Sequence, residues 1–267
     1  MQQAQVICEF TNSNSWVVLS SIEQSIKQKI EAIGTPLKDW DIQINYGIKT
    51  GLNEAFIIPT EKRDEILAAC LSEEERKKTD ALIRPILRGR DIKRYGYEWA
   101  DRWLISTHNG IKEKNIPRVD IENYPAIKAH LDSFWGRIEH RSDQGDTPYN
   151  LRNCVYMEDF LKPKILYPDI SQRLSFCYCS EHIYCNNTVY FITTKNNDDL
   201  PILIEYLNSN LINWYYRTLS VQLGETAVRM FSIYVLNISI PKNVSSKTIY
   251  EAFDLNKEEI NFIESYN

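Results

Sequence analysis

The stretch Lys162–Thr194, KPKILYPDISQRLSFCYCSEHIYCNNTVYFITT, contains three strand-like runs at short spacing. The runs are KPKILYPDI, RLSFCYC and NNTVYFITT, and short polar segments separate them. Strand-like runs that follow one another this closely are typical of an antiparallel sheet. The stretch therefore predicts an antiparallel sheet as a central part of the fold.

Helical patterns flank this stretch on both sides. SIEQSIKQKIEAI at Ser21–Ile33 spaces its isoleucines at helical intervals, and Gly34 and Pro36 end the helix. Further helices are predicted after Thr60, after Ser72, across 121–141, across 200–220 and in the acidic C-terminal segment. Further strands are predicted in DWDIQINYG, EAFIIP, RWLIST and FSIYVLNISIP. The predicted fold class is α+β, with a mixed, largely antiparallel sheet, packed helices and helical segments at both termini.

The composition is that of an ordinary globular protein. The chain has 267 residues, of which 43% are hydrophobic and 25% charged, and can bury a substantial core. No segment approaches the roughly 18 uncharged apolar residues of a membrane span, and the N-terminus lacks the pattern of a signal peptide. We therefore expect a cytoplasmic protein without a membrane partner. The six scattered cysteines are expected to be reduced thiols.

The charge of the chain is segregated along the sequence. The formal net charge is -5, but residues 251–267 contain five acids against one lysine. RPILRGRDIKR at 84–94 contains five cations against Asp91. Such a segment can follow a phosphate backbone while one arginine donates two hydrogen bonds to guanine. Charge alone leaves a second interpretation open, in which these cations form a solvated face or pair with the acids of SEEER.

The signatures of nucleotide enzymes are missing. In YGIKTGLNEAFII at Tyr46–Ile58, Lys49 and Thr50 precede the second glycine, so the spacing of a phosphate-binding loop fails. The chain has no Gly-x-Gly pair, as a dinucleotide site needs, and no adjacent prolines, as the Asn-Pro-Pro-Tyr motif of amino-methyltransferases needs. We therefore do not expect this chain to methylate by itself.

Two short motifs raise the question of a metal. CYCSEHIYC brings together four soft ligands, but their spacing matches no common zinc pattern: Cys177, Cys179, His182 and Cys185. We interpret this segment as a β-hairpin whose cysteines are small buried hydrophobic residues. YPDI resembles the start of a nuclease core, but no acid-x-lysine follows on the next strand. A metal-dependent nuclease that uses Asp169 remains an alternative.

Five motifs in a fixed order carry a family resemblance. They are GIKTGLNEAFII, LIRPILRGRDIKRYG, KPKILYPDI, YCNNTVYFI and YLNSNLINWYYR. Together they resemble the TaqI-like C-terminal specificity domain of type IIG restriction-modification enzymes and related adenine-specific DNA methyltransferases. The resemblance covers Asp39–Pro241. It implies a DNA target recognition domain at 39–242, preceded by an N-terminal segment and connecting helix at 1–38 and followed by an acidic helix at 243–267.

The resemblance also implies partners and cofactors. In this family an N-terminal domain binds S-adenosylmethionine and methylates N6 of a flipped adenine, while the C-terminal domain reads the site. The chain would thus be the non-catalytic part of a longer parent enzyme. Its expected partners are double-stranded DNA and the parent's methyltransferase domain. No cofactor is expected in this chain, whereas the parent would use S-adenosylmethionine, with Mg²⁺ if it also cleaves DNA.

The predicted site residues follow from the same motifs. The family's Gly-x-x-Thr-Gly turn falls on Gly47–Gly51, and its basic element falls on Arg88–Ile92. We expect contacts with the DNA backbone from seven residues: Lys49, Thr50, Arg84, Arg88, Arg90, Lys93 and Arg94. Base readout is expected in the less patterned segment Arg137–Arg152, through Arg137, Arg141 and Arg152. No catalytic or metal-binding residue is predicted.

The acidic C-terminal segment does not fit a DNA-facing surface. We expect it to fold away from the DNA or to contact the catalytic domain. Together with the amphipathic helix at Ser21–Ile33, it also keeps open the alternative of an acidic protein-interaction module.

Overall fold

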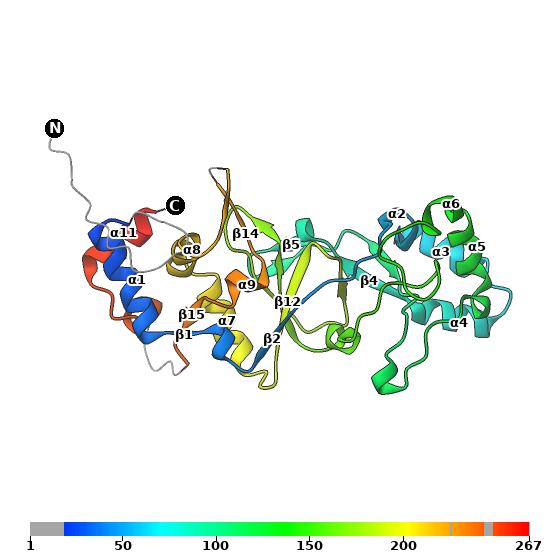
Figure 1. Cartoon of the computed structure of the whole chain (residues 1–267), viewed down its shortest axis with the longest axis horizontal. Helices are drawn as coiled ribbons and strands as arrows, with labels where there is room; N and C mark the ends of the chain where they lie inside the picture. The colour runs from blue at the N-terminus through cyan, green and yellow to red at the C-terminus, as the bar shows by residue number, and fades with distance from the viewer. Residues whose placement is uncertain (1–18, 225, 243–247, 267) are drawn as a thin grey trace.

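The structure of the chain is a computed structural model that describes residues 19–224, 226–242 and 248–266. The molecule is elongated, with α1, α8 and α11 at one end, sheets in the middle and α2 to α6 at the other end (Figure 1). The longer helices are α1 (Ser21–Ile33), α3 (Thr60–Ala68), α4 (Glu73–Leu82), α5 (Pro125–Asp132), α7 (Asp199–Leu207), α8 (Asn210–Arg217) and α11 (Lys257–Ser265). The short helices are α2 (Asn53–Phe56), α6 (Trp135–Ile138), α9 (Ser232–Val235) and α10 (Ile249–Ala252).

Most strands are short. They are β1 (Thr35–Pro36), β2 (Ile42–Tyr46), β3 (Ile57–Pro59), β4 (Ile83–Leu87), β5 (Ile92–Lys93), β6 (Gly96–Tyr97), β7 (Arg102–Ile105), β8 (Lys164–Pro168), β9 (Ile170–Ser171), β10 (Cys177–Cys179), β11 (Tyr184–Cys185), β12 (Val189–Thr194), β13 (Gln222–Leu223), β14 (Ala227–Arg229) and β15 (Ser239–Ile240). The described part of the chain also contains five 3₁₀ turns: η1 (Leu37–Asp39), η2 (Gly89–Asp91), η3 (Lys112–Lys114), η4 (Ile121–Asn123) and η5 (Met157–Leu161).

The central sheet separates two hydrophobic cores. Its strand order is β10-β8-β12-β2, all antiparallel, and the stretch Lys162–Thr194 supplies three of the four strands as predicted. Leu166 pairs with Phe191, and Ile165 pairs with Ile192. Because successive side chains of a strand point to opposite faces, the first pair enters one core and the second pair enters the other. All five residues of β8 are buried for this reason.

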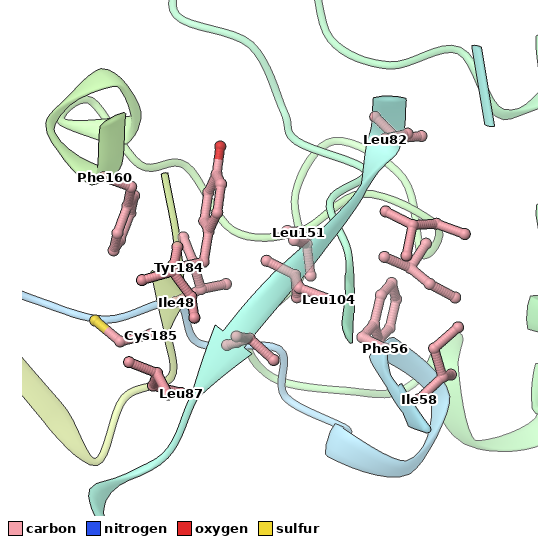
Figure 2. Close-up of a cluster of buried hydrophobic side chains, with 14 of the residues drawn as sticks. Ile48, Phe56, Ile58, Leu82, Leu87, Leu104, Leu151, Phe160, Tyr184 and Cys185 are labelled. Atoms are coloured by element: carbon pink, nitrogen blue, oxygen red, sulfur yellow. The ribbon is translucent and has the colours of Figure 1, made fainter. Parts of the chain in front are cut away.

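The first core, here called the loop core, fills the end of the molecule that carries α2 to α6. It packs around a second sheet of order β11-β4-β7-β3, in which β11 runs parallel to β4 and the other pairs are antiparallel. Its buried residues include Ile48, Phe56, Leu87, Leu104, Leu151, Phe160, Tyr184 and Cys185, which Figure 2 shows around β4. Several of these residues come from irregular segments between elements.

The second core, here called the helix core, lies on the other face of the central sheet. Its buried residues include Ile26, Ile30, Leu203, Leu207, Trp214, Tyr215, Tyr216, Phe253 and Ile263, which come from α1, α7, α8, α11 and the residue after α10. Helix α1 has the predicted bounds, and Ser20 forms a capping box with Glu23 at its start. The fold class predicted from the sequence is confirmed.

Three local predictions were wrong. The cysteine segment is no hairpin, because β10 pairs with β8 whereas β11 pairs with β4 in the other sheet. EAFIIP begins as α2 before it becomes β3, and FSIYVLNISIP forms α9 and the two-residue strand β15. The segment 200–220 is helical as predicted, and it is divided into α7 and α8 where the Asn208 side chain bonds the backbone N–H and C=O of Phe176 and Ser209 caps α8.

The cysteines of the metal-like segment are buried, as the sequence predicted. Cys177, Cys179 and Cys185 are at most 1% exposed, and burial raises the pKa of each thiol. Within the residues that the structure describes, no group of three or more His, Cys, Asp or Glu side chains is placed to hold a metal ion. Over the same residues, no helix has the length and apolar character needed to cross a membrane.

Candidate nucleic-acid interface

Three of the sequence motifs meet at one backbone junction. The turn Gly47–Gly51 joins the loop after β11, since Ile48 N donates to Cys185 O at 2.7 Å and Asn187 N donates to Ile48 O at 3.1 Å. The turn Arg88–Asp91 joins the same loop, since Gly89 N donates to Thr188 Oγ1 at 2.9 Å. Hydrogen bonds thus join motifs that lie up to about 140 residues apart in the sequence.

The two glycines of the first turn have steric roles. A Cβ on Gly47 would lie 2.1 Å from the carbonyl oxygen of Asn186, so only glycine permits this close approach. Gly51 has a φ of +69°, and a Cβ there would lie 3.2 Å from the backbone nitrogen of Asp143. The spacing of the glycines thus serves the packing of the turn against two neighbouring loops.

Each loop at the junction is attached to the loop core by a buried side chain. Ile48 anchors the first turn, Leu87 precedes the basic turn, and Cys185 precedes the third loop (Figure 2). Leu151 anchors the polar segment that was expected to read bases, and it is 2% exposed. Loops fixed in this way to a packed core present their polar side chains in defined positions.

A buried arginine joins the polar segment to the first turn. Arg141 is 6% exposed, and its guanidinium lies 4.6 Å from the centroid of the Phe56 ring. Its four hydrogen-bond acceptors are all backbone carbonyl oxygens, which belong to Thr50, Asp143, Pro148 and Asn150. Burial lowers the pKa of Arg141 to about 10, so the group stays charged at neutral pH.

Other buried polar groups fix the rest of this segment. Asn150 is 1% exposed, and its side chain donates to the carbonyl oxygen of Val119 at 2.9 Å. Thr107 Oγ1 donates to the carbonyl oxygen of Tyr149 at 2.7 Å, and Asn109 Nδ2 donates to Asp146 at 3.0 Å. The polar segment is therefore held at several points along its length.

Five of the predicted DNA-binding cations lie at least partly in solvent. Arg84, Arg90, Lys93 and Arg94 are exposed, and Lys49 is half-buried. Among the described residues, Arg84 and Arg90 have no carboxylate within ion-pair distance, whereas Lys93 lies 3.6 Å from Glu98. Arg84 and Arg90 can approach a polyanion without first breaking an internal ion pair, whereas the side chains of Lys93 and Arg94 donate hydrogen bonds to the backbone carbonyl oxygens of Arg90 and Asn208.

Three other predicted residues have internal partners. Thr50 is 1% exposed, and its hydroxyl donates to Asn53 Oδ1 at 2.7 Å. Arg88 makes two side-chain hydrogen bonds, of 3.1 and 2.9 Å, to Asp91, which is 4% exposed. With Arg141, these residues shape the turns that carry the exposed cations.

The last two predicted residues form ion pairs at the surface. Arg137 pairs with Glu54 of α2, and Arg152 pairs with Asp143 at 3.1 Å. Asp143 also lines a polar pocket of about 250 Å³ beside the first turn, together with Lys49, Thr50, Gly51, Asn53 and Asn187. The prediction from sequence missed Asn53, Asp143 and Asn187. The motif YCNNTVYFI pointed to Asn187, but no pattern in the sequence brought Asp143 to this pocket.

Asp169, on which the nuclease alternative depends, lies directly after β8. Burial raises the pKa of its carboxyl group, against the opposing effects of backbone hydrogen bonds and the nearby Arg229. The helix α11 of the acidic segment contacts α1 and α8 in the helix core, away from the junction (Figure 1).

Comparisons with known sequences identify related proteins. A family model described as the TaqI-like C-terminal specificity domain matches residues 84–240. The type II methyltransferase M.PaeR7I of Pseudomonas aeruginosa is 24% identical over 230 residues, which cover 85% of this chain and 37% of that protein. The type II methyltransferase M.MjaIV of Methanocaldococcus jannaschii is 26% identical over 181 residues, which cover 65% of this chain and 56% of that protein. The chain thus spans between about a third and just over half of these relatives.

Two solved structures share the fold. The type IIG restriction endonuclease BpuSI has a TM-score of 0.52 at 13% identity, covering 92% of this chain and 28% of that chain. The type IIL restriction-modification enzyme MmeI, solved in complex with DNA, has a TM-score of 0.54 at 16% identity, covering 76% of this chain and 25% of that chain.

Proposed function

The chain belongs to the TaqI-like C-terminal specificity domain family, and we propose from this membership that it recognises the DNA target of an adenine-N6 methyltransferase. The resemblance found in the sequence is confirmed by the family model and by the type II methyltransferase relatives. Within the proposal the parent is a type IIG restriction-modification enzyme, and residues 39–242 carry the recognition of DNA.

The junction of the three motifs is the observation that supports this proposal most. Lys49 follows Ile48 and Arg90 follows Gly89. Both Ile48 and Gly89 are hydrogen-bonded to the loop that contains Asn187. Each loop is also anchored in the loop core, so the surface is preorganised before DNA arrives. A preorganised surface with cations and amides suits a duplex, which offers phosphates to the cations and base edges to the polar side chains.

We assign different roles to the predicted residues. Five exposed or half-exposed cations contact the DNA backbone: Lys49, Arg84, Arg90, Lys93 and Arg94. Thr50, Arg88 and Arg141 hold the loops in shape, because their side chains bond to other parts of the chain. Arg137 and Arg152 lie in the segment that we propose to face the bases.

The catalytic chemistry belongs to the rest of the parent. We propose that a methyltransferase domain of the same polypeptide binds S-adenosylmethionine and transfers its methyl group to adenine, with Mg²⁺ needed only if the parent also cleaves DNA. This chain contributes no cofactor ligand in the proposal. Its partners are double-stranded DNA and that methyltransferase domain.

The proposal is tested by the salt dependence of duplex binding. A variant with Lys49→Ala, Arg84→Ala and Arg90→Ala should bind mixed-sequence duplexes more weakly whatever their sequence. Each lost phosphate contact makes the negative slope of log K against log salt less steep by about 0.9, so the magnitude of the slope should fall by about 2 to 3. Fluorescence anisotropy of a labelled duplex at several salt concentrations measures both quantities.

A matched control removes three cations from elsewhere. Lys27 of α1, Lys195 after β12 and Lys257 of α11 lie outside the junction. Alanine at these three positions should change the net charge equally. It should leave the slope close to that of the chain without substitutions, here called the parent chain. Equal losses in both triple variants, or no duplex binding by the parent chain at low salt, would refute the proposed function.

A further inference from the structure

We propose that Arg152, oriented by Asp143, reads one guanine of the recognised site through guanine O6 and N7. The inference rests on the proposed function and adds to it one specificity-determining residue and one chemical class of target, a G·C base pair. It is carried by the geometry of the Arg152–Asp143 pair and by how this pair is supported.

The pair leaves most of the guanidinium available. Arg152 Nη1 donates to Asp143 Oδ1 at 3.1 Å, and among the described residues Asp143 is the single partner of this guanidinium. The side chain of Arg152 is 50% exposed, and that of Asp143 is 28% exposed. A planar guanidinium has five N–H donors in a fixed fork, so one bond to a carboxylate still leaves a pair for a base edge.

The backbone of Asp143, which carries the carboxylate that orients Arg152, is itself held in place. The carbonyl oxygen of Asp143 accepts a hydrogen bond from Arg141. Its backbone nitrogen packs closely against the first turn, at the point where a Cβ on Gly51 would lie 3.2 Å away. Because Asp143 is fixed by two contacts, binding a base needs little further ordering of the Arg152 side chain.

The charge of the pair favours a base over a phosphate. Within the described part of the chain Arg84 and Arg90 have no carboxylate partner and suit the polyanionic backbone, whereas Asp143 offsets the charge of Arg152. The same carboxylate can accept from the N4 amino group of the cytosine paired with the guanine. Arginine donors for guanine beside a carboxylate acceptor for cytosine therefore match a C·G pair. With a T·A pair at the same position, the carboxylate would face the O4 acceptor of thymine, and two acceptors repel each other.

The other surface ion pair of the segment is less well supported. Arg137 pairs with Glu54, but the side chains are 57% and 64% exposed. Among the described residues each of the two carboxylates has one arginine partner, but the Glu54 side chain is 64% exposed against 28% for Asp143, so its position is less restricted. For this reason we assign the reading role to Arg152.

The test is a selection of duplexes from a random pool by the chain, followed by sequencing of the bound fraction. We expect the parent chain to select a motif with guanine at a position where Arg152→Ala shows no base preference. The loss of discrimination at that position should be about 5- to 150-fold, with the other positions unchanged. Arg152→Lys should behave like the alanine variant at that position, because an ammonium cannot donate in the same fork.

Arg118→Ala is the matched control. Arg118 lies 3.9 Å from Asp146, and the side chains of this pair are 49% and 51% exposed. The control thus removes an arginine of similar exposure from a similar pair, and it should keep the motif of the parent chain. Thermal melting of each variant checks that the fold is intact.

The outcomes separate the inference from the function on which it rests. If the parent chain selects no motif, the proposed function fails and the inference falls with it. If the parent chain selects a motif that lacks guanine, or if Arg152→Ala selects the same guanine, DNA recognition stands and the role of Arg152 is refuted.

Discussion

The two cores flank the same sheet but are built differently. In both cores most buried residues come from regular elements, and in the helix core large aromatic side chains such as Trp214 and Tyr215 fill the interior. In the loop core irregular segments contribute single anchors such as Ile48 and Leu151, and buried polar groups such as Arg141 complete the packing. Helices satisfy their own backbone groups, whereas loops need side chains to do so. In the loop core, buried side chains such as Arg141 and Asn150 therefore maintain the shape of the loops.

The largest effect on stability is expected from a substitution in the helix core. Trp214 is 2% exposed, and Trp214→Ala should lower the free energy of unfolding by about 3 to 5 kcal/mol because it leaves a large cavity. Urea denaturation measures this loss. At temperatures where the variant is folded, its duplex affinity should equal that of the parent chain. A loss of affinity in the folded variant would mean that the two cores are not functionally separate.

A substitution of Arg141 is expected to cost less stability than Trp214→Ala but to weaken DNA binding more. Arg141→Met keeps an unbranched aliphatic stem but removes the guanidinium that donates to four carbonyl oxygens, of which the Asn150 oxygen still accepts from Gly145 N. The free energy of unfolding should fall by about 1 to 3 kcal/mol. Duplex affinity should also fall, because residues 142–150 and the turn Gly47–Gly51 lose their shared support.

Chemical denaturation and anisotropy measure the two effects of Arg141→Met on the same samples. The contrast with Trp214→Ala is the informative quantity, since the less destabilised variant should be the poorer DNA binder. If Arg141→Met bound duplexes as the parent chain does, the buried arginine would have no part in presenting the loops.

The sequence predicted some parts of these two regions better than others. Local patterns could be recognised in it, whereas contacts between distant segments could not. Helix α1 was predicted with correct bounds because its apolar spacing and its stop residues are local. The central sheet followed from runs that are close along the chain.

The tertiary role of single polar residues could not be predicted. Arg141 is buried because carbonyl oxygens from separate segments converge on it, and no local pattern encodes that convergence. The hairpin predicted for the cysteine segment failed for a related reason. A short apolar run predicts a strand but not its partner, and here β10 and β11 pair in different sheets.

The smallest effect on stability is expected at the ion pair between Lys29 of α1 and Glu259 of α11. Glu259 is 2% exposed and accepts from Lys29 Nζ at 2.8 Å and from Ser25 Oγ at 2.7 Å. Burial opposes ionisation, but these hydrogen bonds outweigh it and lower the pKa of Glu259. A carboxyl group with a lowered folded pKa stabilises the fold above its unfolded pKa, and this contribution is lost as the pH falls through the folded value.

The corresponding variant is Glu259→Gln. It should be less stable than the parent chain by about 1 kcal/mol at neutral pH. The difference should shrink as the pH falls below the ordinary glutamate value of 4.5. Thermal melting across this range measures it, and a difference that stays constant with pH would show that the charge of Glu259 does not contribute.

Hydrogen exchange of the chain with and without a duplex tests most directly whether the loop core presents the DNA-binding surface. On binding at low salt, we expect protection in residues 47–53, 88–94 and 142–153, with α1, α8 and α11 unchanged. Protection confined to α1, α8 and α11, or no change in any of these segments, would contradict this assignment.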